Sequence, residues 1–275
     1  MIFKKKPGMT LVEVLVAIVI GVISAAAVFY SYNIFNKSYQ SVMDKAKMNS
    51  SSRNALSMIL KDLRNAGYCD INYNGSCDRL VEKKDNRFAW VENYKVTFSQ
   101  YYQGGADYLA IEYNSSPQMR KEIRYYLIAY DRNNLKEANG RISFYLAREV
   151  IEKQIGKNPK KVYCKKYRNQ TDCAPIMITP FVSDFQVVFK DKNGKELSDV
   201  CFDCSSQTAK DNQKEVHTAE IYLTVRSSHQ IYSADKEVII TNHDPNKKGL
   251  RQTITDRYHR ETFYASAYLR NIVLN

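Results

Sequence analysis

Six cysteines are the residues with the most evident potential for covalent chemistry. An even number of cysteines in local pairs indicates disulfide bonds in an oxidising compartment. The alternative is a zinc site, because the spacing in Cys201-Phe-Asp-Cys204 is that of a zinc knuckle. No second C-x-x-C accompanies it, so nearest-neighbour disulfides are preferred and no metal or cofactor is expected. The three couples are Cys69 with Cys77, Cys164 with Cys173, and Cys201 with Cys204.

One acidic residue, Glu13, is the only charge in the apolar run from residue 9 to residue 30. A carboxylate inside a membrane segment is costly, so a chain that keeps one usually supplies a partner for it. Glu13 is also close enough to the start of the run to be a tolerated interfacial residue. Both interpretations stay open on this residue alone.

Enzymatic motifs are missing from the sequence. It has no glycine-rich phosphate loop, no G-x-S-x-G and no H-E-x-x-H. Acidic residues such as Asp62 and Asp70 are assigned to helix capping and solvation, and Asp191 to Gly194 to a hairpin turn in preference to a calcium loop. We therefore expect no enzyme. The histidines lie in polar contexts and are expected to be scattered surface residues: His217, His229, His243 and His259.

The net charge of +12 is spread along 275 residues, with 41 basic residues interleaved with 29 acidic ones. This pattern favours a solvated basic surface over a dedicated nucleic-acid stripe. Nucleic-acid binding remains an alternative, because lysines and an arginine cluster between residues 157 and 168. The length suits one elaborated domain beside a membrane segment.

The elements that position these residues begin with the apolar run. Its 22 residues would form a helix of roughly 33 Å, enough to cross a bilayer. Lys4, Lys5 and Lys6 precede it and should stay in the cytoplasm, which places the rest of the chain outside the inner membrane. A secretory signal peptide is disfavoured, because the run is long and no convincing A-x-A cleavage site follows.

The helix is expected to continue beyond the membrane and to end at Gly67, a typical C-terminal stop. Residues 49 to 52 have weak helix propensity and predict a bend or an N-cap. Apolar spacing from residue 55 to residue 63 indicates a helix that packs on a sheet. Alternation predicts strands at 94–99, 107–113, 123–131, 141–149, 185–190 and 217–226, turns at Asn139-Gly140 and Asn193-Gly194, and a loop from 242 to 255.

The string Lys6-Pro7-Gly8-Met9-Thr10-Leu11-Val12-Glu13 resembles the class III signal of type IV prepilins and pseudopilins. The resemblance implies that a prepilin peptidase cuts after Gly8 and that Met9 becomes the N-methylated first residue. Met9 replaces the common Phe, a mild departure. Glu13 would then neutralise a neighbouring subunit's amine and act in subunit recruitment and assembly.

Four further segments resemble minor pilins of the PilW type: residues 62–68, 107–113, 219–227 and 263–271. The last resembles the closing strand of that family. Residues 153–175 match nothing known to us. The resemblance implies an α+β type IV pilin-like fold, with a long N-terminal helix packed on antiparallel sheet. The expected division is a leader at 1–8, a transmembrane and filament-core helix at 9–30, its amphipathic continuation at 31–67 and a globular periplasmic domain at 68–275.

The implied function is structural: priming and assembly of a type IV pilus. The implied partners are the prepilin peptidase, the major pilin, other minor pilins and the inner-membrane assembly platform. The chain would sit in the inner membrane with its C-terminal domain in the periplasm and then enter the pilus. The alternatives are a J-like pseudopilin of a type II secretion system, a pilus-tip adhesin or DNA-uptake module, and an uncut single-pass periplasmic protein.

Overall fold

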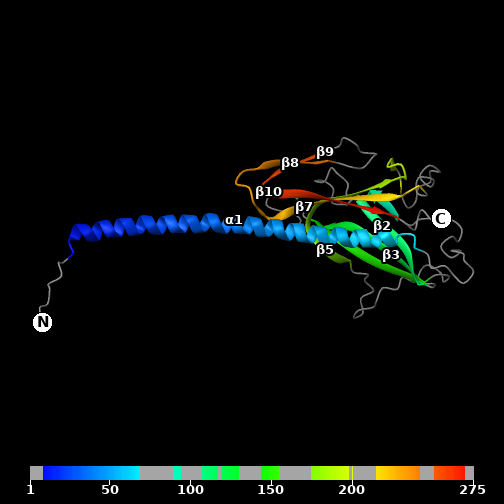
Figure 1. Ribbon diagram of the computed structural model, residues 1–275, viewed down its shortest axis with the longest axis horizontal. Helices are drawn as coiled ribbons and strands as arrows, with labels where there is room; N and C mark the ends of the chain where they lie inside the picture. Colours follow the sequence, from blue (N-terminus) through cyan, green and yellow to red (C-terminus); the bar gives the residue numbers. More distant parts are fainter. Residues whose placement is uncertain are drawn as a thin grey trace, which may run out of the picture. The chain divides into compact units, whose positions relative to one another are not determined.

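The computed structural model describes residues 9–68, 89–93, 107–116, 119–129, 144–154, 175–197, 200, 215–241 and 251–269. Its contacts divide the chain into two compact units, Met1–Ala46 and Lys47–Asn275. The first unit holds the beginning of the only helix among these residues, and the second holds the rest of that helix and the strands (Figure 1). The cysteines, Gly8, His243, the expected strand at 94–99 and the turn at Asn139-Gly140 lie outside the described residues.

Helix α1 spans Leu11–Asn65 without interruption. The expected N-cap at residues 49–52 is therefore wrong. The Ser51 hydroxyl donates a hydrogen bond back to the Met48 carbonyl, with an Oγ–O distance of 3.1 Å. It is therefore bonded within the same helix and does not cap the start of a second one. Its neighbour Ser52 is fully buried. The Ser51 carbonyl also accepts a hydrogen bond from the Thr179 hydroxyl at 3.2 Å, so tertiary contacts at Ser51 and Ser52 offset the weak helix propensity of this stretch.

The helix ends as predicted at Gly67, whose φ of 72° lies in the left-handed region that favours glycine. The Gly67 N–H donates to the Glu112 carbonyl at 3.0 Å, and the Asn114 N–H donates to the Tyr68 carbonyl at 2.9 Å. The stop is thereby tied to strand β2 (Asp107–Ser116). It sets where the chain leaves the helix and meets the sheet.

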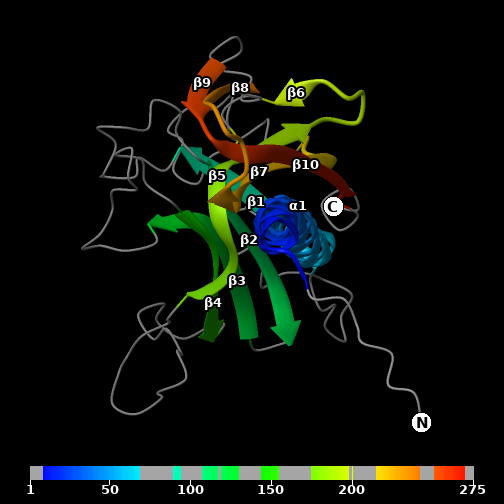
Figure 2. The ribbon, with the colours of Figure 1, turned by 90° about the vertical axis from the view of Figure 1, so that its left-hand side faces the viewer.

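The strands form one large antiparallel sheet in the order β1-β2-β3-β4-β5-β7-β10, with β6 paired to β5, and a separate pair β8-β9. Figure 2 shows the large sheet curving from β2 and β3 round to β7 and β10. The expected α+β architecture is confirmed, and the sheet is continuous through β5. The bounds are β1 Ala89–Asn93, β2 Asp107–Ser116, β3 Met119–Ala129, β4 Phe144–Gln154, β5 Ile176–Lys190, β6 Glu196–Leu197, β7 Thr218–Gln230, β8 Lys236–Thr241, β9 Arg251–Asp256 and β10 Tyr258–Tyr268.

Strand β5 spans Ile176–Lys190 and is much longer than the predicted strand at 185–190, because it pairs with two different strands. Its first part pairs with β4 and its second with β7, and the registers shift near Val182. Phe181, just before that point, has a φ of 58°, a conformation that non-glycine residues rarely adopt. The strand turns a corner there, which curves the sheet.

Two further predictions concern residues 251–255 and the turn at Asn193-Gly194, and only the first differs from the structure. Residues 251–255, expected in a loop, belong to β9, which pairs with β8 from Lys236↔Asp256 to Thr241↔Arg251. The predicted turn at Asn193-Gly194 is confirmed: Gly194 has a φ of 79°, and the Asp191 carboxylate accepts the N–H of Asn193 and of Lys195, both at 2.8 Å. This Asx-type turn joins β5 to β6.

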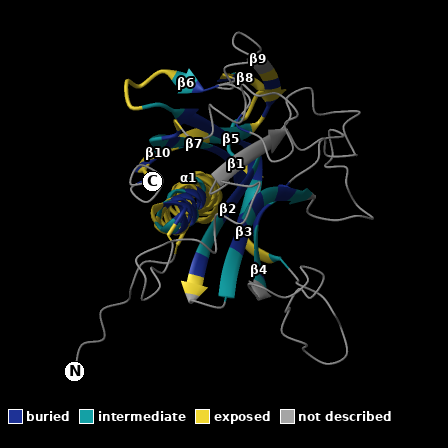
Figure 3. Cartoon of the chain, turned by 90° about the vertical axis from the view of Figure 1, so that its right-hand side faces the viewer, coloured by how far each residue is buried: buried dark blue, intermediate teal, exposed yellow. Residues whose placement is uncertain are grey.

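The core lies between the second part of α1 and one face of the sheet, and buried residues appear dark blue in Figure 3. The helix contributes a stripe with the predicted spacing, and each fully buried large aliphatic side chain contributes roughly 1.5–3 kcal/mol to folding. The helical members are Met48, Ala55, Leu56, Ile59, Leu63 and Ala66, and the sheet partners include Ile111, Ile123, Leu146, Phe185, Ile221 and Leu223.

Candidate functional site

The start of α1 is a reciprocal cap between Thr10 and Glu13. The Glu13 carboxylate accepts the Thr10 backbone N–H at 2.8 Å and the Thr10 hydroxyl at 3.0 Å, while the Glu13 N–H donates to Thr10 Oγ1 at 3.3 Å. This is a capping box, which satisfies two of the N–H groups that a helix start leaves open. Thr10 was missed as a site residue, although the T-x-x-E signature before an apolar run could have revealed it.

The cap explains how the Glu13 carboxylate is stabilised at the start of an apolar helix before any other subunit binds. Glu13 has a hydrogen-bonding partner within its own first turn, and its charge lies near the positive end of the helix dipole. One oxygen, Oε2, makes both contacts with Thr10. A cation from a neighbouring molecule would therefore pair with a Glu13 carboxylate whose position Thr10 already fixes.

The surface around this cap is apolar and exposed. Met9, Leu11 and Val12 are exposed, and so are most of the large apolar side chains that follow as far as Tyr39. One 18-residue window of α1 has a mean hydropathy of 2.7 with none of it buried, so the helix is long and apolar enough to span a membrane. By length and composition this fits a single-pass membrane anchor.

Further along α1, Asp62 belongs to a different kind of contact. Its carboxylate Oδ2 accepts a hydrogen bond from the Tyr125 hydroxyl of β3 and one from Arg148 Nε of β4, the latter at 2.9 Å. Arg148 Nε also lies 3.1 Å from the Tyr125 oxygen. Burial and the Asp62 charge raise the pKa of Tyr125 well above its usual range, so the phenol remains a donor. The expectation that Asp62 serves in capping and solvation is wrong, because it is buried at the helix–sheet contact.

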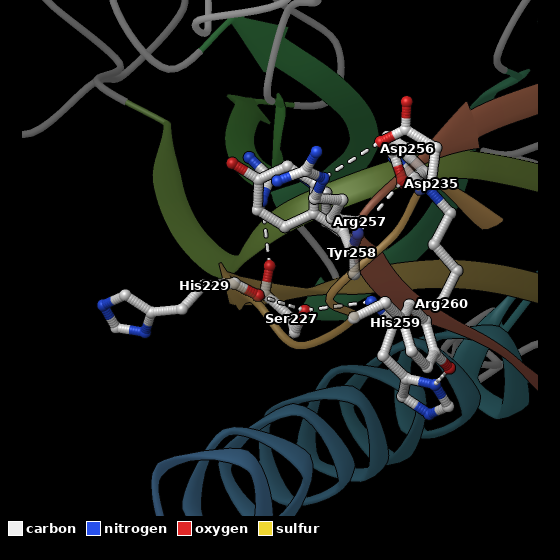
Figure 4. A network of polar contacts seen from close by, with 11 residues as sticks. Ser227, His229, Asp235, Asp256, Arg257, Tyr258, His259 and Arg260 are labelled. Atoms are coloured by element: carbon white, nitrogen blue, oxygen red, sulfur yellow. Dashed lines mark hydrogen bonds and ion pairs between the residues drawn. The ribbon is translucent and has the colours of Figure 1, made fainter. Parts of the chain in front are cut away.

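A second polar network joins β7, β9 and β10, with Asp256 and Arg260 labelled in Figure 4, and it extends to Ser183 of β5. Arg260 binds the buried Asp256 carboxylate through both terminal nitrogens, with Nη2–Oδ2 at 2.7 Å, and donates from Nε to Ser183 Oγ at 3.2 Å. Arg226 lies over the ring of Tyr258, 4.1 Å from its centroid, and burial lowers its pKa to about 10. These contacts fix the corner of the sheet beside Phe181.

The described histidines do not gather into a site. His217 lies beside Tyr268, His229 beside Ser228, and His259 Nδ1 is 2.8 Å from the Tyr232 hydroxyl. Within the part of the chain that the structure describes, no three His, Cys, Asp or Glu side chains are grouped so as to hold a metal ion. The candidate disulfides and the alternative zinc site lie outside that part, as does Gly8, and they remain predictions.

Comparison with known proteins supports the reading of the N-terminus. Residues 3–29 match the family described as the prokaryotic N-terminal methylation motif. No curated protein matches the chain. Among solved structures, a type IV-like pilin from Thermus thermophilus is similar at 10% identity and a TM-score of 0.40, covering 82% of this chain and 97% of that one.

The chain therefore carries the N-terminal methylation motif of type IV prepilins at the start of one long apolar helix, followed by an antiparallel sheet. The motif implies cleavage by a prepilin peptidase. Pilin-like proteins in general interact with other pilins and with the assembly machinery. They are structural subunits, not typically enzymes. The combination is consistent with a component of a pilus or pseudopilus.

Proposed function

We propose that the chain is a minor pilin of the PilW type, which helps to prime and assemble a type IV pilus after its leader is removed. The observation that carries the proposal is the capped Glu13 at the start of an exposed apolar helix, within the matched methylation motif. In this role Gly8 precedes the cut and Met9 becomes the N-methylated first residue. The exposed surface from Leu11 to Val28 packs the filament core.

Glu13 recruits the next subunit in this proposal. The cut creates a cationic amine at Met9, and a neighbour's amine can neutralise the Glu13 carboxylate when both leave water together. Thr10 acts as a positioning residue, because it holds Glu13 Oε2 in the first turn. The charge pairing sets the register of one subunit against another along an otherwise featureless apolar surface.

The proposed location follows from the lysines at positions 4 to 6, which place the chain's beginning in the cytoplasm and the sheet-bearing unit in the periplasm of a single-pass inner-membrane protein. The oxidising periplasm fits the proposed disulfides Cys69–Cys77, Cys164–Cys173 and Cys201–Cys204. The partners are the peptidase, the assembly platform, the major pilin and other minor pilins.

Mass spectrometry of the mature protein tests the processing step. We expect a chain that begins with N-methylated Met9. An intact Met1 in cells that contain the peptidase, or a cut near Ala27, would refute the proposal.

Substitution of Glu13 tests the assembly step. Glu13→Ala and Glu13→Gln should leave cleavage largely intact and reduce incorporation into filaments, whereas Thr10→Ser, which keeps the capping hydroxyl, should assemble normally. Normal incorporation of both Glu13 variants would contradict the assigned role. Incorporation into a short secretion pseudopilus and not into a pilus would instead identify a type II secretion pseudopilin.

A further inference from the structure

The outer face of strands β7 and β10, opposite the core, carries an ordered set of tyrosine and hydroxyl side chains. The register places Tyr264 beside Tyr222 and Thr262 beside Thr224. The two threonine hydroxyls are 2.9 Å apart, and the two tyrosine rings lie 5.2 Å apart at an angle of 46°. We call this surface the tyrosine face; it comprises Glu220, Tyr222, Thr224, Thr262, Tyr264 and Tyr268.

The rings of the first pair are held in place by Glu220. Its carboxylate accepts hydrogen bonds from the hydroxyls of Tyr222 and Tyr264, both at 3.0 Å, and from Lys190 Nζ at 2.7 Å. Although burial acts in the opposite sense, these bonds lower the pKa of Glu220, so it is ionised at neutral pH. The rings are thus fixed before any ligand arrives, which reduces the entropy cost of binding.

A second aromatic pair lies further along the same face. The Tyr268 ring lies beside the His217 ring, with centroids 6.1 Å apart and the planes tilted by 51°. Tyr264 and Tyr268 are four residues apart in β10 and therefore about 13 Å apart at the usual rise of an antiparallel strand. Both are about half exposed, at 54% and 52%. Two exposed aromatic positions at this spacing span more than one sugar ring.

The charges on this face are balanced. Lys190 is paired with Glu220, and the nearby Arg260 is paired with Asp256. A nucleic-acid site needs unneutralised cations along its stacking platform, and the described part of this face offers paired ones. The face therefore favours a neutral ligand, in spite of the net charge of +12.

The types of side chain on this face also favour a sugar over a protein as its ligand. Tyrosine is enriched in protein interfaces as well, but the fully buried centre of such an interface is largely apolar. Among the described residues of β7 and β10, the outward side chains are tyrosine, threonine, serine, glutamate and arginine, with no exposed aliphatic side chain between them. Aromatic rings with hydroxyl and carboxylate neighbours suit a pyranose chain, whose C–H faces stack on the electron-rich ring face and whose hydroxyls hydrogen-bond at the edges.

We propose that the tyrosine face binds a neutral polysaccharide, with one sugar ring stacked on the Tyr222–Tyr264 pair and another ring of the same chain, further along it, on Tyr268. Glu220 is a positioning residue, which orients the first pair. The exposed Thr262 hydroxyl lies beside that pair, and the buried Thr224 hydroxyl holds it in place from below. This binding is independent of the N-terminal processing and assembly proposed above.

The test is calorimetric titration of the full chain in detergent with chitohexaose and cellohexaose. We expect saturable binding of at least one of them. Tyr264→Ala and Tyr268→Ala should each weaken it about tenfold through loss of a stacking ring. Tyr264→Phe keeps the ring and should retain most of the binding. Tyr68→Ala, which removes an exposed tyrosine from another part of the chain, should leave the affinity unchanged.

Three outcomes would overturn this proposal. The first is no binding of either oligosaccharide by a chain whose near-ultraviolet circular dichroism is native. The second is equal loss of binding in Tyr68→Ala. The third is a Tyr264-dependent self-association or oligothymidylate binding without saccharide binding, which would assign the face to a subunit contact or to nucleic acid. Normal leader cleavage in all these variants separates the result from the proposed assembly role.

Discussion

Helix α1 has two regions that share one secondary structure but differ in the exposure of their apolar side chains. Up to Ala46 its large apolar side chains are mostly exposed, whereas from Lys47 onward its apolar stripe is buried under the sheet. Each region also carries an acidic residue. Glu13 is satisfied by its sequence neighbour Thr10, and Asp62 is satisfied by Tyr125 and Arg148, which are distant in sequence.

This contrast shows how one continuous helix can serve two purposes. The second region is committed to the chain's own fold, because its partners are already present. The first region keeps its apolar surface available for a membrane or for other subunits, and its charge is stabilised locally so that it needs no tertiary contact. Substitutions of the same type should therefore have very different effects in the two regions.

The largest expected effect compares two isoleucines. Ile59 is fully buried and Ile34 is 48% exposed in the same helix. Ile59→Ala removes buried methyl groups and leaves a cavity, so it should lower the free energy of unfolding of the sheet-bearing unit by about 2–5 kcal/mol. Ile34→Ala should leave it unchanged within about 0.5 kcal/mol. Urea unfolding of the full chain in detergent, followed by near-ultraviolet circular dichroism, measures both. Equal losses of unfolding free energy in the two variants would show that the two regions contribute alike to the stability of this unit.

An intermediate effect is expected from Asp62. Asp62→Ala leaves the Tyr125 hydroxyl and the Arg148 guanidinium without their shared acceptor in a mostly buried place. We expect a loss of about 1–3 kcal/mol in the same unfolding experiment. The neighbouring Lys61 is exposed, and Lys61→Ala is the matched control, with no change beyond about 0.5 kcal/mol. If the Asp62 variant behaves like the control, the buried network makes no net contribution to stability.

The smallest effect concerns two glycines of the helical segment. Gly67 has a left-handed φ of 72°, so Gly67→Ala should cost about 1 kcal/mol of folding stability. A Cβ at Gly21 would meet nothing within 4 Å, and Gly21→Ala should leave the unfolding midpoint of the sheet-bearing unit unchanged. Parallel urea titrations compare them. A destabilising Gly21→Ala would mean that the first region takes part in that unfolding transition.

Local patterns in the sequence were sufficient for much of this protein. The apolar run, the helix stop at Gly67 and the turn at Asn193-Gly194 depend on neighbours within a few residues, so periodicity and turn chemistry predict them. The same holds for β2, β3, β4, β7 and the second part of β5. The methylation motif is local too. The capping role of Thr10 belongs to the same class, because the Thr10–Glu13 spacing alone specifies it.

Other features were decided by the tertiary structure. Residues 49–52 remain helical, with Ser52 buried and Ser51 bonded to Thr179 of the sheet. Strand β5 extends back to Ile176 because it pairs with strands on both sides of its corner at Phe181. Residues 251–255 become a strand because β8 lies opposite them. The role of Asp62 and the arrangement of the tyrosine face depend on residues brought together from different strands, and no local pattern encodes such pairings. The sequence determined where a helix begins, what it exposes and where it stops; the fold decided which of its side chains acquire partners.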